Sequence, residues 1–124
     1  ERIEMMSGYE SAIAMAQLQQ RPLLIIFGAD WCSWCRKLEG ELEAEAAGSI
    51  LSRWIVTKVD VDDEPEIANR FSASALPALR ILTTSQNVIG GREGYQTLDE
   101  LQQWLDENLV RADPKIQAVL YESG

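Results

Sequence analysis

Histidine is absent from this chain of 124 residues, and cysteine occurs only twice. The lack of histidine excludes Ser-His and Cys-His catalytic pairs and removes the commonest metal ligand. Basic residues are few, with 11 lysines and arginines against 20 aspartates and glutamates, which gives a net charge of −9. No basic cluster is available to displace counterions from phosphates, so we expect no nucleic-acid partner. We interpret the acidity itself as a source of solubility.

Long apolar runs are missing as well. The longest covers residues 23–27, far below the roughly 18 residues that cross a bilayer, so we expect no membrane insertion in this segment. No repeat, low-complexity tract or linker interrupts the chain. Its length suits one compact domain over residues 1–124, with a C-terminal helical extension over residues 110–124. We expect this domain to be a monomer.

Hydrophobic periodicity predicts an alternation of helices and strands. The apolar run at 23–27 is typical of a strand buried on both faces. Ser7 and Glu10, like Thr97 and Glu100, have the spacing of a capping box that begins a helix. The predicted helices cover residues 7–20, 36–54 with a break near Gly48, 62–71 with Asp63 as the cap, 97–109 and 113–122, and the further strands cover residues 55–61, 77–83 and 87–93.

This order of elements predicts the fold class. A strand, a helix and another strand in succession imply two parallel strands joined by a right-handed crossover. The strands over 77–83 and 87–93 are close enough to form a hairpin, which adds antiparallel pairing. The chain is therefore expected to be an α/β protein with a central mixed β-sheet and helices on both faces.

The two cysteines, Cys32 and Cys35, lie between a buried strand and a helix, with Ser33 and Trp34 between them. A cysteine at the first turn of a helix faces unpaired backbone N–H groups and the positive end of the helix dipole, which both favour the thiolate. Cys35 falls one turn later on the same face, where we expect deeper burial. The pattern suits a redox couple in which Cys32 is the nucleophile and Cys35 resolves the mixed disulfide.

Four other uses of the two cysteines remain open. A zinc site needs four ligands, usually Cys or His, which this chain does not contain, although two chains could share one. The two thiolates could instead handle a soft metal such as Cu(I). A structural staple gains little from so short a loop, and two inert buried thiols are the remaining alternative.

The segment "DWCSWCRKLE", after "LLIIFGA", resembles the active-site region of thioredoxin-like proteins, whose motif is W-C-x-x-C-K/R. In the same order, "VTKVDVDDEPEIANRF", "SASALPALRIL" and "GYQTLDELQQWLDENL" resemble that family's second central strand and helix, its cis-proline segment and its last helix. The resemblance covers about residues 9–109 and implies a thioredoxin fold. It also implies a thiol–disulfide oxidoreductase that acts on protein thiols and disulfides in either direction, with no cofactor and no metal.

The resemblance also implies a substrate-binding surface. The Leu76–Pro77 peptide bond would be cis and would lie against the reactive cysteine, and the Leu76 backbone would pair with an extended substrate segment. Trp31, Ser33 and Trp34 would complete this surface. The alternative for Pro77 is a trans proline that opens an edge strand.

The chain departs from the family pattern at two places. Ser33 and Trp34 replace Gly-Pro, and Ile26 stands where ordinary thioredoxins have a buried acid. Lys58 matches a family lysine that pairs with this acid. Lys58 is expected either to bias the thiols electrostatically or to be a plain solvated side chain. For Arg36 we expect a solvated role, with weak electrostatic tuning of the thiols as the alternative. Deprotonation of Cys35 would then rely on water, a backbone group or the substrate, so we hypothesise a specialised partner.

The tryptophans around the cysteines have competing interpretations. Trp34 either offers a flat docking surface to a partner or folds back on the helix over 7–20 or 62–71. For Trp31 we expect half-buried packing, with partner contact as the alternative. Trp54 and Trp104 are predicted to lie in the core. The acidic run of Glu39, Glu41, Glu43 and Glu45 is expected to be a solvated helix surface.

A non-enzymatic binding module is the main rival to the enzyme. In that case the surface of Trp31, Trp34 and Pro77 would hold a partner, and the cysteines would turn over slowly. The form Trp-Cys-x-Trp-Cys-Arg resembles a bacterial thioredoxin-like branch often found in the cell envelope. This likeness favours the periplasm over the cytoplasm, although no signal peptide is visible in "ERIEMMSGYE".

Overall fold

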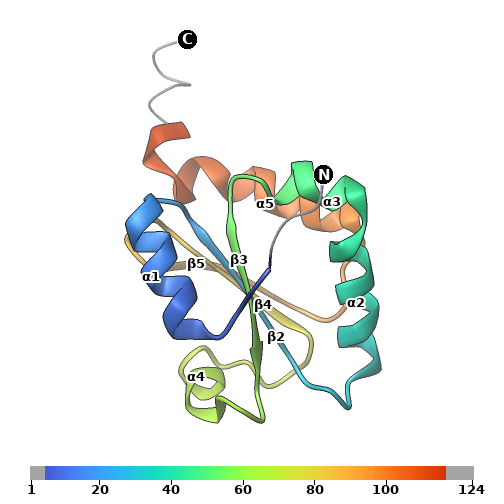
Figure 1. Cartoon of the computed structure of the whole chain (residues 1–124). Coiled ribbons are helices and arrows are strands. Elements are labelled where there is room, and N and C mark those ends of the chain that lie inside the picture. Colours follow the sequence, from blue (N-terminus) through green and yellow to red (C-terminus); the bar gives the residue numbers. More distant parts are fainter. Residues whose placement is uncertain (1–4, 117–124) are drawn as a thin grey trace.

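A mixed five-stranded sheet forms the centre of the molecule (Figure 1). The computed structural model describes residues 5–116. The strands lie in the order β1-β3-β2-β4-β5, with β2 in the middle of the sheet. The first three are mutually parallel, whereas β4 is antiparallel to β2, and β5 is antiparallel to β4. The strands are β1 (Met6–Ser7), β2 (Leu23–Gly28), β3 (Ile55–Asp60), β4 (Ala78–Leu82) and β5 (Val88–Glu93).

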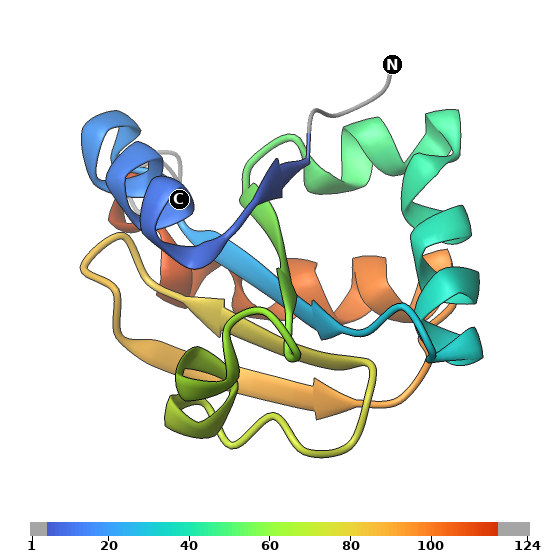
Figure 2. The same ribbon diagram turned by 60° about the horizontal axis from the view of Figure 1, so that its bottom comes forward.

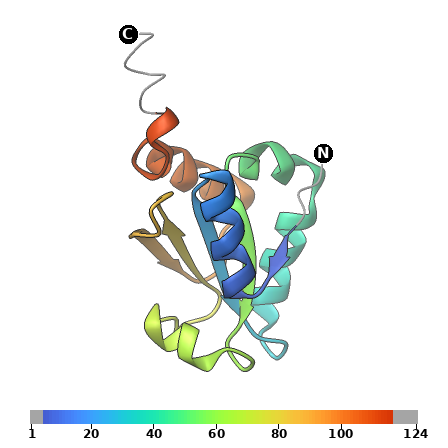
Figure 3. The same ribbon diagram turned by 60° about the vertical axis from the view of Figure 1, so that its left-hand side comes forward.

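Helices cover both faces of this sheet (Figure 2). The helices are α1 (Tyr9–Gln19), α2 (Ser33–Glu43), α3 (Glu45–Leu51), α4 (Pro65–Arg70) and α5 (Leu98–Ala112). Helices α1 and α4 pack on one face, and α1 runs beside β3 (Figure 3). Helices α2, α3 and α5 pack on the other face. The predicted α/β class, with a mixed sheet between two helical layers, is confirmed.

The central strand β2 is buried on both faces, as its uninterrupted apolar sequence predicts. Leu24 and Ile26 point into the core beneath α2, α3 and α5. Leu23, Ile25 and Phe27 belong to the core beneath α1 and α4. Because side chains alternate between the faces of a strand, a strand between two helical layers needs apolar residues at every position.

Strand β5 carries two adjacent glycines, which let large side chains of β4 lie against it. A Cβ atom at Gly91 would come within 2.9 Å of the Arg80 guanidinium, and one at Gly90 within 3.1 Å of Ile81. Arg80 is buried, and its guanidinium donates to the backbone oxygens of Phe71 and Ser72 at 3.0 and 3.1 Å. A charged side chain thus ties β4 to the chain segment that leads to the cis proline.

The predicted capping box at Ser7 and Glu10 is wrong. Ser7 belongs to β1 and pairs with Lys58 of β3. Helix α1 begins after Gly8, whose φ of 93° lies in the left-handed region that glycine tolerates, and no side chain caps it. The Tyr9 N–H instead donates to the Glu64 carboxylate at 3.5 Å. A strand of only two residues is too short to show a periodic pattern. It includes Ser7, the residue that the local sequence pattern predicts as a helix cap.

Two further boundaries differ from the prediction. The helix predicted over 36–54 breaks at Ala44, which is extended with ψ of 146°, and Gly48 lies buried within α3. Packing decides this break, because the turn brings Ala47 and Leu51 into the core. Helix α4 begins after Glu64, not Asp63, and no side chain caps it.

The last helix, α5, begins with the predicted capping box and runs past residue 109 to Ala112. The Glu100 N–H donates to the Thr97 hydroxyl at 3.2 Å, and the Thr97 N–H donates to the Glu100 carboxylate at 3.0 Å. Of the additional helix predicted over 113–122, residues 114–116 are helical, and the remainder lies outside the described residues. Within residues 5–116, no helix is long and apolar enough to cross a membrane.

Replacing Thr97 with alanine is expected to lower the free energy of unfolding by about 1 kcal/mol, since the helix loses its N-cap. The Thr97 N–H, and then the Thr97 hydroxyl, donate to Glu100 and lower the pKa of its carboxyl from 4.5. The carboxylate's contribution is present above this ordinary value and is lost as pH falls through the lowered pKa. Alanine keeps the N–H donor and loses only the hydroxyl donor, so the variant lacks only the hydroxyl's share of this stabilisation. Urea unfolding should therefore show a small narrowing, below about pH 4, of the difference in unfolding free energy between the two proteins. An equal difference at pH 7 and pH 3 would contradict this.

Candidate functional site

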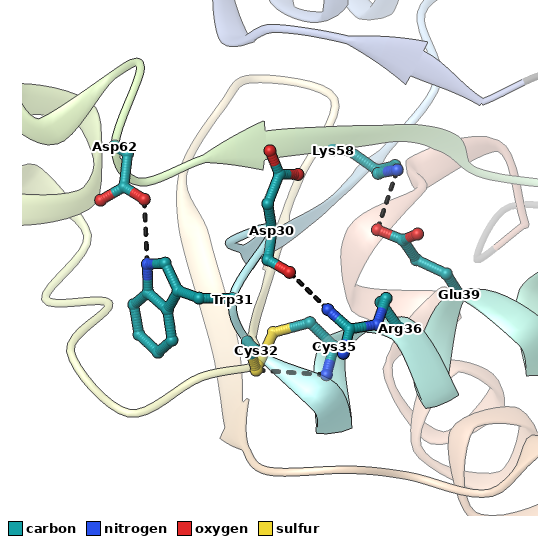
Figure 4. The surroundings of a disulfide bond; sticks show 8 residues. All are labelled: Asp30, Trp31, Cys32, Cys35, Arg36, Glu39, Lys58 and Asp62. Carbon is teal, nitrogen blue, oxygen red and sulfur yellow. Dashed lines mark hydrogen bonds and ion pairs between the residues drawn. A yellow bond between two sulfur atoms is a disulfide. The ribbon is translucent and has the colours of Figure 1, made fainter.

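The two cysteines follow the central strand β2, at the start of helix α2, and they are joined by a disulfide (Figure 4). Their Cα atoms are 5.3 Å apart. Cys32 is the N-cap of α2, and the backbone N–H of Cys35 donates to the Cys32 sulfur at 3.2 Å. The predicted placement of the pair at a helix N-terminus is therefore correct. An N–H directed at this sulfur favours negative charge on it.

Burial does not distinguish the two sulfurs as we expected. Cys32 is 7% exposed and Cys35 is 5% exposed, and both pack with Ala29, Val61 and Leu76. Gly28 at the end of β2 allows Cys35 to lie close to the strand, since a Cβ atom there would come within 3.3 Å of the Cys35 sulfur. The difference between the two cysteines lies in the backbone N–H donor, which only Cys32 receives from Cys35.

The loop before β4 lies against this disulfide. The Leu76–Pro77 peptide bond is cis, as the resemblance implies, and Pro77 is buried. Leu76 packs against the cluster that contains both cysteines, and it stays partly exposed. The structure therefore brings together the cysteines and this loop, which lie more than 40 residues apart in the sequence. Ser33, between the cysteines, is exposed.

The half-buried packing predicted for Trp31 is wrong, because the residue is 69% exposed. Its indole N–H donates to the Asp62 carboxylate at 3.0 Å, from the turn after β3 (Figure 4). This hydrogen bond holds one edge of the ring while the apolar faces stay open to solvent. No local signal in the sequence indicates a contact across 31 residues.

Trp34 is also open to solvent, with 55% of its surface exposed. It lies in the first turn of α2, and its ring centroid is 5.8 Å from that of Tyr95. The Lys37 ammonium lies 5.1 Å from the Trp34 ring and 4.7 Å from the Tyr95 ring. Neither predicted helix is its packing partner, because the ring rests on the segment between β5 and α5. Two exposed tryptophans thus lie around the disulfide.

Two members of the acidic run have specific contacts, so the prediction of a purely solvated surface is wrong for them. Glu39 forms an ion pair with Lys58 at 2.8 Å. Glu41 accepts the backbone N–H of Leu98 at 3.2 Å and so ties α2 to the start of α5. Partial burial, and then the carboxylates of Glu41 and Glu100, raise the pKa of Tyr95.

The two cations singled out in the sequence both have partners. Arg36 donates to the backbone oxygen of Asp30, and Lys58 binds Glu39 (Figure 4). A cleft of about 380 Å³ lies beside the disulfide, and its lining includes Cys35, Arg36, Glu39 and Lys58. Within the part of the chain that the structure describes, no group of three or more His, Cys, Asp or Glu side chains could hold a metal ion.

Comparisons with known proteins agree with this geometry. The thioredoxin family model matches residues 4–107. A thioredoxin from Alicyclobacillus acidocaldarius is 33% identical, with the match covering 72% of this chain and 83% of that protein. Thioredoxin 1 from Chlorobaculum tepidum is 33% identical, over 58% of this chain and 70% of that protein.

A solved structure shows the same fold. The solution structure of a thioredoxin from Thermus thermophilus has a TM-score of 0.78 and 22% identity, over 89% of this chain and 91% of that one. The family model spans most of the chain, and the cysteine pair lies where the central strand meets α2. This chain therefore belongs to the thioredoxin family.

Proposed function

We propose that this thiol–disulfide oxidoreductase works with Cys32 as the nucleophile and Cys35 as the resolving thiol. One observation carries the assignment: only Cys32 caps a helix and receives a backbone N–H on its sulfur, at 3.2 Å. The two cysteines are almost equally buried. The backbone donor is therefore what stabilises the Cys32 thiolate relative to the Cys35 thiolate.

The chemistry needs only the two thiols and a substrate disulfide. The Cys32 thiolate attacks one substrate sulfur, a mixed disulfide forms, and the other substrate sulfur leaves as a thiolate that takes a proton from solvent. Cys35 loses its proton and attacks the Cys32 sulfur. The Cys32–Cys35 disulfide forms and the second substrate thiolate leaves. Two electrons pass from the chain to the substrate, and the same steps in reverse oxidise a dithiol.

The proposed substrate surface surrounds the cysteines. Leu76, partly exposed before the cis proline Pro77, would offer its backbone to an extended substrate segment. Ser33 and the two exposed indoles of Trp31 and Trp34 would contact the substrate on either side. Large rigid aromatic side chains anchor partner proteins at low entropic cost, which supports this role. A net charge of −9 supports a protein partner over nucleic acid, and we propose that the chain acts as a monomer.

Cys35→Ser should accumulate a covalent complex with protein partners. This variant keeps the Cys32 nucleophile and lacks the thiol that would release the mixed disulfide. The variant is incubated with native extract, and trapped complexes are counted on non-reducing gels. The matched control is the double variant with Cys32→Ser and Cys35→Ser, which should trap nothing.

Insulin disulfide reduction by the wild-type protein, driven by dithiothreitol, is the parallel measurement. Turnover and trapping together support the oxidoreductase. If the wild type reduces no insulin and Cys35→Ser traps nothing, the proposal is wrong, and a binding module becomes the better account.

A further inference from the structure

Resolution of the mixed disulfide requires the Cys35 thiol to lose a proton. The strand beneath it offers no proton acceptor, because the β2 side chains from Leu23 to Phe27 are all hydrocarbon. Cys35 nevertheless lines the cleft of about 380 Å³, a volume sufficient for several water molecules. The side chains that share this cleft with Cys35 are therefore the candidates for receiving the proton.

Glu39 is the carboxylate in this cleft that shares a helix face with Cys35. It follows Cys35 by four residues on α2, so the two side chains project from neighbouring turns of one face. Both residues line the same cleft. The Glu39 side chain is 32% exposed, which leaves it half-buried between the helix and the sheet and still in contact with water.

Lys58 holds this carboxylate in place. The Lys58 ammonium is 2.8 Å from the Glu39 carboxylate, and Figure 4 shows this pair near Cys35 and Arg36. Lys58, Glu39 and Cys35 all line the cleft. In the parallel pairing of β2 and β3, Lys58 lies directly beside Ile26, two residues before the glycine that Cys35 packs against. The ion pair therefore places a carboxylate near the part of the sheet that Ile26 leaves apolar. This carboxylate comes from helix α2 and not from strand β2.

Six other charged groups face the same cleft, and three of them, Arg36, Asp60 and Glu64, form hydrogen bonds elsewhere. They are Asp30 and Arg36 near the disulfide, Lys58 and Asp60 on β3, and Asp63 and Glu64 before α4. Asp60 accepts the backbone N–H groups of Asp62 and Asp63, and Glu64 accepts that of Tyr9. Asp30 and Asp63 are exposed and lie on other segments than α2.

We propose that Glu39 accepts the Cys35 proton through water in the cleft. The proton leaves the Cys35 sulfur, a bridging water passes a proton to the Glu39 carboxylate, and the Cys35 thiolate attacks Cys32. The Cys32–Cys35 bond forms, the bond from Cys32 to the substrate sulfur breaks, and Glu39 then returns its proton to solvent. The inference rests on the proposed oxidoreductase function and identifies how its second step proceeds.

Single-turnover reaction of the reduced protein with 5,5′-dithiobis(2-nitrobenzoate) separates the two steps. Attack by Cys32 releases one thionitrobenzoate, and attack by Cys35 on the mixed disulfide releases the second. In Glu39→Gln, the second release should slow roughly 100-fold at pH 7, and the first should stay unchanged. The deficit should shrink above pH 9, where hydroxide removes the proton directly. Glu39→Asp should restore part of the rate.

The matched control is Glu43→Gln, which removes the same charge from an exposed position on the same helix. It should react like the wild type in both steps. The direction of the effect separates proton transfer from simple electrostatics. Removing Glu39 would leave Lys58 unpaired, and a nearby cation stabilises a thiolate, so a purely electrostatic role predicts a faster second release. A half-exposed ion pair adds little stability, so Glu39→Gln should unfold thermally like the wild type.

A second release in Glu39→Gln that is as fast as in Glu43→Gln, or faster, overturns the proposal. That result leaves the oxidoreductase function intact, because the wild type still releases both equivalents. If the wild type releases no second equivalent, the proposed function itself fails. The two results therefore separate a failure of proton transfer to Glu39 from a failure of the oxidoreductase function.

Discussion

Replacing Cys32 with alanine is expected to lower the rate of disulfide reduction by at least roughly 10³-fold, to the uncatalysed background. The substrate disulfide must be attacked by a thiolate, and Cys32 is the sulfur that the helix N-terminus stabilises. Cys35 cannot replace it, because its sulfur packs close to Gly28 and receives no such backbone donor. Steady-state reduction of insulin by dithiothreitol measures this loss.

Alkylation shows whether the loss comes from the thiol itself or from unfolding. Reduced Cys35→Ala, which retains Cys32, should react readily with iodoacetamide at pH 7, whereas reduced Cys32→Ala, which retains Cys35, should react slowly. The two variants carry the same chemical change, so each is the control for the other. Equal alkylation rates in two folded variants would show that the backbone donor does not distinguish the thiols.

Replacing Arg80 with methionine should lower the free energy of unfolding by about 3 kcal/mol. The guanidinium is buried and donates to the backbone oxygens of Phe71, Ser72 and Leu79 at 2.8 to 3.1 Å. Methionine fills similar space but leaves buried acceptors without donors, at about 1–3 kcal/mol each. Urea unfolding at pH 7 measures the change.

Glu93→Gln is the matched control for Arg80. Glu93 pairs with the Arg80 guanidinium at 2.6 Å, but its side chain is 47% exposed. An ion pair with one solvent-exposed partner contributes about 0–1 kcal/mol to the free energy of unfolding, so this variant should remain nearly as stable as the wild type. A loss in Glu93→Gln as large as that in Arg80→Met would assign the stabilisation to the ion pair and contradict our account. In our account, the loss of stability in Arg80→Met comes from backbone oxygens that no longer accept a hydrogen bond.

Much of this fold could be predicted from local patterns. The apolar strand β2, the parallel crossover to β3, the hairpin of β4 and β5 and the capped helix α5 all have strong signals in neighbouring residues. The cysteine pair was recognisable for the same reason, because its chemistry depends on two residues of one helical turn. The predicted core positions of Trp54 and Trp104 are also confirmed.

Several predictions failed where a residue's partner is distant in the sequence. Ser7 pairs with β3, Trp31 is held by Asp62, and Glu39 is held by Lys58. An acidic run with a spacing of two looks like a solvated surface when only the helix is considered. Two of its members face other elements once α2 is packed against the sheet and α5.

The sequence by itself determined the layers of the fold, the redox couple of Cys32 and Cys35 and the acid missing at Ile26. The layers follow from periodicity and the couple from chemistry between close neighbours, whereas the missing acid at Ile26 is recognised only through the resemblance to the thioredoxin family. Tertiary structure alone decided that Trp31 and Trp34 stay exposed beside the disulfide and that Glu39 meets Lys58 in the cleft. The reason is physical: ion pairs and ring contacts act over a few ångströms in space, and only the packed chain determines which distant residues come that close.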